Sequence, residues 1–172
     1  MLVQPLRTVI ARDLRALARE VAAYPDDESL WRVMPGITNS GGTLAVHLAG
    51  NLRHFIGTRL GGGSYVRDRK AEFAGIARPR AEVVAEIESA IAEVDAALAR
   101  LDDASLERAF PDPLYGRTLD IDVLALHLAV HLGYHLGQID YHRRMVTGNE
   151  ATVDAMSLME LPEAQRERTV AS

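Results

Sequence analysis

Hydrophobic residues recur at intervals of three and four along four stretches of this chain, and charged residues occupy most of the positions between them. This spacing is typical of helices that bury one face. No segment shows the alternation with period two that predicts a half-buried strand. We therefore expect an all-α protein, a four-helix bundle in a single domain over residues 1–172. The helices are predicted over four ranges: 3–23, 42–60, 79–101 and 119–146.

Segments rich in proline, glycine and charged residues separate the four predicted helices. Ser40 or Thr43 is a candidate N-cap for the second helix. Pro79 falls in the first turn of the third helix, where its lack of an N–H leaves no helical hydrogen bond unmade. Gly148 ends the fourth helix, and the chain beyond it is expected to be an irregular tail. Connecting loops are predicted over residues 25–42, 61–70 and 102–116.

Composition and charge narrow the classes of function. The chain has no cysteine, which excludes disulfides, thiolate metal sites, iron–sulfur clusters and a thiol nucleophile of its own. Its net charge of −5 argues against binding to nucleic acid or to an anionic membrane. No apolar stretch reaches the length of about twenty residues that a membrane span needs. We expect a cytoplasmic protein that binds neither nucleic acid nor membrane.

The histidines carry the candidate chemistry, because all of them fall on the second and fourth predicted helices. Residues four apart on a helix share one face. Apolar neighbours predict that both helices are largely buried, and buried imidazoles need partners for their nitrogens. A divalent metal ion is the simplest partner that several converging histidines have in common. The six are His47 and His54 on the second helix, and His127, His131, His135 and His142 on the fourth.

His131 and His135 form an HxxxH pair, whose spacing lets two imidazoles share one ion. Such pairs also occur by chance in helices, so two packed histidines are the structural alternative. Leu132 stands where zinc proteases carry the glutamate of HExxH, which argues against a metalloprotease. Gly133 and Gly137 each cost about 1 kcal/mol relative to alanine inside a helix. We attribute them to the close approach of a neighbouring helix or a ligand.

Two segments of the chain resemble the DinB/YfiT-like superfamily of metal-binding helical bundles. They are residues 42–56, GTLAVHLAGNLRHFI, and residues 127–139, HLAVHLGYHLGQI. Together with the helical layout, the resemblance covers about residues 3–146. It implies that one divalent metal ion is bound, zinc or nickel in the first place, with iron or copper also compatible. By position, the ligands that it implies are His47, His131 and His135.

Three further residues, close in the sequence to these histidines, are candidates for the surroundings of the metal: His127, Asn51 and Gln138. The structural alternative is a packed core histidine for the first and hydrogen bonds between helices for the two amides. His54 and His142 lie further along their helices, and we expect them at the surface or in a polar network.

The charged connector over residues 65–69 allows two interpretations. Its arginines would clamp an anionic substrate if the connector folded over the open end of the bundle. A solvated connector is the simpler interpretation and the one we favour. Trp31 is expected to pack its loop onto the bundle. Asp140, the acid nearest to the histidines in the sequence, is expected to point away from them.

The resemblance implies a metal-dependent enzyme of the thiol-transferase or isomerase type. It would act on a small molecule together with a low-molecular-weight thiol such as bacillithiol or mycothiol, so the chain itself needs no cysteine. One alternative is a hydrolase that uses metal-bound hydroxide. Another is a non-catalytic, metal-binding, stress-associated scaffold. A pocket that opens on the metal favours an enzyme. The resemblance and the heptad spacing of the third helix also predict a homodimer.

Overall fold

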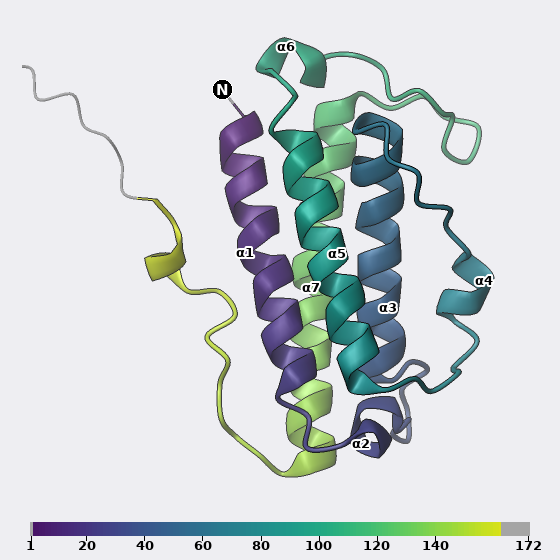
Figure 1. Cartoon of the computed structure of the whole chain (residues 1–172), viewed down its shortest axis with the longest axis vertical. Helices are drawn as coiled ribbons and strands as arrows, with labels where there is room; N and C mark the ends of the chain where they lie inside the picture. Colours follow the sequence, from purple (N-terminus) through teal and green to yellow (C-terminus); the bar gives the residue numbers. More distant parts are fainter. Residues whose placement is uncertain (1, 163–172) are drawn as a thin grey trace, which may run out of the picture.

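The computed structural model describes residues 2–162, and its regular structure over these residues is helical (Figure 1). Two isolated bridge pairs are the only β-type pairing in that range. Helix α1 packs against α5 and α7, and α3 packs against the same two helices, so the long helices enclose one core. The expected all-α fold is therefore confirmed. The long helices are α1 (Val3–Ala22), α3 (Gly41–Leu52), α5 (Arg80–Leu98) and α7 (Ile121–Thr147).

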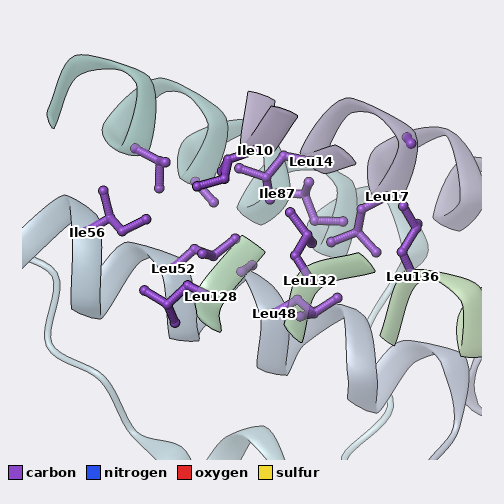
Figure 2. Close-up of a cluster of buried hydrophobic side chains, with 14 of the residues drawn as sticks. Ile10, Leu14, Leu17, Leu48, Leu52, Ile56, Ile87, Leu128, Leu132 and Leu136 are labelled. Carbon is purple, nitrogen blue, oxygen red and sulfur yellow. The ribbon is translucent and has the colours of Figure 1, made fainter. Parts of the chain in front are cut away.

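Aliphatic side chains from all four long helices fill this core (Figure 2). On α7, the leucines at four-residue intervals point inward: Leu128, Leu132 and Leu136. Each such buried side chain contributes about 1.5–3 kcal/mol of hydrophobic stabilisation. Because successive helical residues are rotated by about 100°, the residue before each leucine lies on the adjoining face. That residue is a histidine in every case: His127, His131 and His135.

The predicted second helix spans its expected range in two forms. Helix α3 continues into the π-helix η1 (Arg53–Leu60), so the helical hydrogen-bond pattern changes part-way along. Ser40, rather than Thr43, is the N-cap of α3, and its hydroxyl accepts a hydrogen bond from the Thr43 N–H at 3.1 Å. Periodicity alone predicted a continuous α-helix here, because a π-turn leaves little trace in the hydrophobic pattern.

Three single-turn helices interrupt the predicted loops, which are therefore less irregular than expected. They are α2 (Asp27–Trp31), α4 (Arg69–Glu72) and α6 (Asp103–Leu106). Each begins after an aspartate whose side chain accepts a hydrogen bond from the N–H three residues later. Helices of one turn are too short to show a hydrophobic period, so only this capping signal marks them in the sequence.

The heptad spacing of the third predicted helix has an explanation within the chain. Its apolar residues on α5, such as Ile87 and Val94, are buried in the core against α1 and α3.

The two glycines of α7 differ from expectation. A Cβ added at Gly133 or Gly137 would meet no atom within 4 Å in the described part of the chain. Close approach of a neighbouring helix of the same chain is therefore not the reason for these glycines.

The segment after α7 is anchored along α1. Gly148 ends α7 with a φ of +66°, as expected for a glycine C-cap. The segment is irregular apart from the short 3₁₀-helix η2 (Leu158–Glu160), and Arg19 of α1 pairs with Glu160 at 2.7 Å. The rest of the predicted tail, residues 163–172, lies outside the described residues. Among residues 2–162, no helix combines the length and apolar character needed to cross a bilayer.

Candidate metal centre

Three histidines converge between α3 and α7. His47 comes from the middle of α3, and His131 and His135 come from successive turns of α7. Each offers a ring nitrogen, and these nitrogens lie within 4.8 Å of one another. The Nε2 atoms of His47 and His131 are 3.4 Å apart. Two nitrogens bound to one tetrahedral zinc ion are separated by roughly 3.4 Å, given zinc–nitrogen bonds near 2.0–2.1 Å. The donor set therefore fits a single divalent ion.

Glu72 orients His47 for this role. Its Oε2 lies 3.0 Å from Nδ1 of His47. The N–H at Nδ1 donates a hydrogen bond to the carboxylate, and Nε2 keeps its lone pair for a metal. The ring of Phe73 packs on the imidazole at 4.7 Å between centroids. A carboxylate behind a metal-binding histidine fixes its tautomer and makes it a stronger ligand. Both residues belong to the segment around α4, which lies beside α3 in Figure 1.

Arg67 holds Glu72 in place through two hydrogen bonds of 2.7 and 2.8 Å. Burial alone would raise the pKa of Glu72, but the hydrogen bonds from Arg67 and His47 outweigh it, and the net effect is a lowered pKa. The carboxylate is therefore ionised at neutral pH. Glu72 is only 5% exposed, and the Arg67 side chain is 10% exposed. Within the connector over residues 65–69, the expectation of a solvated segment is wrong for Arg67, because its side chain folds back onto Glu72 and α3, whereas Val66 is 86% exposed.

Gly50 makes room for this arrangement. A Cβ at this position would overlap Oε1 of Glu72 and lie 3.0 Å from the hydroxyl oxygen of Tyr65. Because glycine has no Cβ, the segment that carries Glu72 can approach the α3 backbone closely. Glycines that admit a close neighbour, Gly50 among them, are therefore found on α3, whereas Gly133 and Gly137 of α7 have none within 4 Å in the described part of the chain.

The two histidines of α7 are held as neutral imidazoles. Nδ1 of His135 lies 2.6 Å from Oε1 of Gln138, which leaves Nε2 of His135 for a metal. Burial, together with the neighbouring histidines, lowers the pKa of His131 to about 4. Burial also lowers the pKa of His135, although its hydrogen bond with Gln138 acts in the opposite direction. Neutral imidazole is the form that binds metals, so the site needs no proton release at pH 7 from these two residues.

The other predicted candidates lie around the three histidines. His127 stacks on His131 with 6.0 Å between ring centroids, but it is not one of the three histidines whose nitrogens converge. Asn51 is 7% exposed and follows His47 by one turn. Its side-chain oxygen has no hydrogen-bond partner in the described part of the chain, so it has an unmet capacity to accept one.

His142 belongs to a separate polar network. Its Nδ1 lies 2.7 Å from the Tyr24 hydroxyl and its Nε2 lies 2.7 Å from the carbonyl oxygen of Arg32. This matches the expected polar network, although His142 is buried rather than at the surface. His54 is half-buried on η1 and outside the three-histidine group. Trp31 packs against Gly42 at the start of α3, as expected.

A comparison with protein-family models gives a match to the DinB superfamily over residues 10–139. This range covers most of the chain and contains all three converging histidines. The chain belongs to the DinB superfamily. A search of curated proteins found no match.

In this DinB superfamily member, the histidines border an open pocket. A cavity of about 680 Å³ has His47, His127 and His131 in its wall, together with Asn51. A second hollow of about 420 Å³ is bordered by His135 and other residues of α7. The site is thus reached from two sides, and it is not sealed under side chains.

Glu72 is the residue that sequence reasoning missed. Asp140, the acid nearest to the histidines in the sequence, pairs with Arg143 and Arg144 and points away from the site as expected. Glu72 lies in a connector with no hydrophobic period. The sequence signals that bear on its position are the aspartate cap at Asp68 and the glycine at position 50, and neither predicts a contact with His47.

Proposed function

We propose that this DinB-type four-helix bundle is a metal-dependent transferase that joins a low-molecular-weight thiol to a small electrophilic substrate. The observation that carries the proposal is the convergence of three imidazole nitrogens between two open pockets, with His47 and His131 in the wall of one and His135 in the wall of the other. His47, His131 and His135 would hold one divalent ion, for which zinc or nickel is the first choice and iron or copper the second. When bound, the ion would act as a Lewis acid that lowers the pKa of a thiol beside it.

The protein's own residues would keep this donor set in place. Glu72 orients His47, Gln138 orients His135, and Arg67 balances the charge of Glu72. The three ligands are neutral, so they leave the positive charge of the ion available to a thiolate. The thiol loses its proton to solvent, its sulfur bonds to the electrophilic carbon, and the leaving group departs with its electron pair.

Two features support a thiol and a second substrate over hydrolysis. The chain has no cysteine, so a sulfur nucleophile has to arrive as a cosubstrate. The hollows of about 680 and 420 Å³ on either side of the histidines would accommodate two molecules. A hydrolase would benefit from a general base. No carboxylate is among the described residues that line the larger cavity, and His127 is the imidazole there that lies outside the three converging histidines. Glu72, the nearest acid, is fully engaged by His47 and Arg67.

The test is thiol consumption by the metal-loaded protein. Bacillithiol and mycothiol are incubated with a panel of small electrophiles, and free thiol is followed over time. We expect turnover that His131→Ala abolishes and His54→Ala, a substitution on the same pair of helices outside the site, leaves intact. Substrate breakdown at equal rates with and without thiol would identify a hydrolase. Stoichiometric metal without turnover of either kind would identify a scaffold.

A further inference from the structure

The larger pocket has a charge that differs from that of the chain as a whole. The protein has 24 acidic against 19 basic side chains, yet three arginines and no carboxylate line this cavity among the described residues. The three are Arg67, Arg69 and Arg117. Arg67 is neutralised by Glu72. The other two have no ion pair to a carboxylate within residues 2–162, so the pocket holds two uncompensated positive charges.

Arg117 lies at the end of a tight turn that two backbone hydrogen bonds close. The N–H of Leu114 donates to the Arg117 carbonyl at 2.8 Å, and the N–H of Arg117 donates back to the Leu114 carbonyl at 3.0 Å. Tyr115 and Gly116 at the tip of this turn have φ values of +50° and +76°. An ion pair between Arg59 of η1 and Asp112 fastens the same loop to the helices. The position of Arg117 beside the pocket is therefore set by the fold.

Arg69 lines the same cavity from α4. It is the first residue of α4, directly after the capping Asp68, and its guanidinium lies 5.0 Å from the ring centroid of Phe73. Phe73 in turn packs on His47. Arg69 is thus positioned by the same short helix that supports the metal centre, and its charge faces a cavity shared with His47.

The wall of the cavity also offers an amide and an apolar surface. Asn51 lines it and is more than nine-tenths buried. Its side-chain oxygen is covered and accepts no hydrogen bond from the described residues, so it faces the protein rather than the cavity. Phe55 and Leu124 line the same cavity and provide its apolar surface.

We propose that this cavity binds a small organic anion, a carboxylate or a phosphate ester, through Arg69 and Arg117. The apolar body of the molecule lies along Phe55 and Leu124. Guanidinium groups recognise both kinds of anion through paired hydrogen bonds. One part of this proposal rests on the proposed function, namely that the bound anion is the electrophilic substrate of thiol transfer. The binding itself needs no metal.

The test is isothermal titration of the full-length protein with three probes of the same shape: benzoate, phenyl phosphate and benzyl alcohol. At least one of the two anions should bind, and the uncharged alcohol should not. Replacing either arginine by glutamine should weaken binding of the anion roughly tenfold or more, as expected for loss of a charge-assisted hydrogen bond. Arg80→Gln, at the start of α5 and outside the cavity, is the matched control and should bind like the wild type.

The variants and probes in this experiment distinguish failure of this proposal from failure of the proposed function. Binding with unchanged affinity to wild-type protein stripped of metal by a chelator, together with loss in Arg69→Gln/Arg117→Gln, supports the arginine site whatever the fate of thiol transfer. Preference for benzoate or for phenyl phosphate identifies the kind of anion. Equal affinity in the wild type and the double arginine variant would overturn the proposal. So would binding that removal of the metal abolishes, because the metal would then hold the anion.

Discussion

Replacing Glu72 by glutamine should weaken metal binding although Glu72 is not a ligand. The carboxylate accepts a hydrogen bond from Nδ1 of His47 at 3.0 Å, and a nitrogen of Arg67 lies only 3.3 Å from the same Nδ1. Without the carboxylate charge, Arg67 can donate to Nδ1 instead. The imidazole proton then moves to Nε2, the atom that faces His131, and blocks it as a ligand.

The size of the effect follows from this change of partner. Loss of the group behind a metal-binding histidine typically costs ten- to a hundredfold in affinity, about 1.4–2.8 kcal/mol. The variant also leaves the charge of Arg67 uncompensated beside a divalent ion, so we expect a value in the upper part of this range. Glutamine keeps the size of the side chain, which limits any change in packing against α3.

Competition with a chromophoric zinc chelator of known affinity measures the loss, and circular dichroism verifies that the variant is folded. Glu93→Gln is the matched control. Glu93 forms a similar two-bonded pair with Arg53, at 2.7 and 3.0 Å, and within residues 2–162 no hydrogen bond or ion pair joins it to a histidine. Zinc affinity equal to that of the wild type in a folded Glu72→Gln protein would refute the role assigned to Glu72.

Three further predictions concern stability and assembly. Gly50→Ala should destabilise the protein in urea unfolding, because the new Cβ displaces Glu72, whereas Gly133→Ala on open α7 should be neutral or stabilising by up to about 1 kcal/mol. Burial lowers the pKa of His142, so the unfolded chain takes up its proton first, and the metal-free protein should lose stability as pH falls below about 6.5. His142→Gln should reduce that dependence, while His131 and His135, whose pKa values are also lowered, maintain the remainder. An unchanged slope would contradict the role of His142. Homodimer formation stays a prediction: light scattering should give twice the chain mass of 18.8 kDa, and the mass of a single chain at micromolar concentration would refute it.

The long helices were predictable because their evidence is local. Spacing of three and four residues marked the buried face of each one. On α7 it holds for Leu124, Leu128, Leu132 and Leu136, whereas Leu126 is 46% exposed. The same periodicity placed His131 and His135 one turn apart on a shared face. Their meeting with His47, on a helix more than eighty residues away, was implied by the family resemblance and not by the spacing.

The surroundings of the site were less predictable, because they depend on contacts between distant segments. Glu72 contacts His47 from α4, just beyond the connector over residues 65–69 for which the sequence favoured a solvated segment, and this stretch carries charge but no hydrophobic period. The sequence predicted a close neighbour at Gly133, where the structure has none within 4 Å among the described residues. Such a neighbour is found at Gly50 instead, where Glu72 approaches the helix backbone. A glycine in a helix indicates that a side chain is missing, and only the tertiary structure shows what takes its place.

The central claim is that one divalent ion is bound by three histidines, and metal stoichiometry tests it most directly. The protein is purified from its native host, dialysed against a weak chelator and analysed for metal by mass spectrometry. The account predicts one equivalent in the wild type and in His54→Ala, and loss of stoichiometric metal in His47→Ala, His131→Ala and His135→Ala. A full equivalent retained by the His131→Ala protein would contradict it.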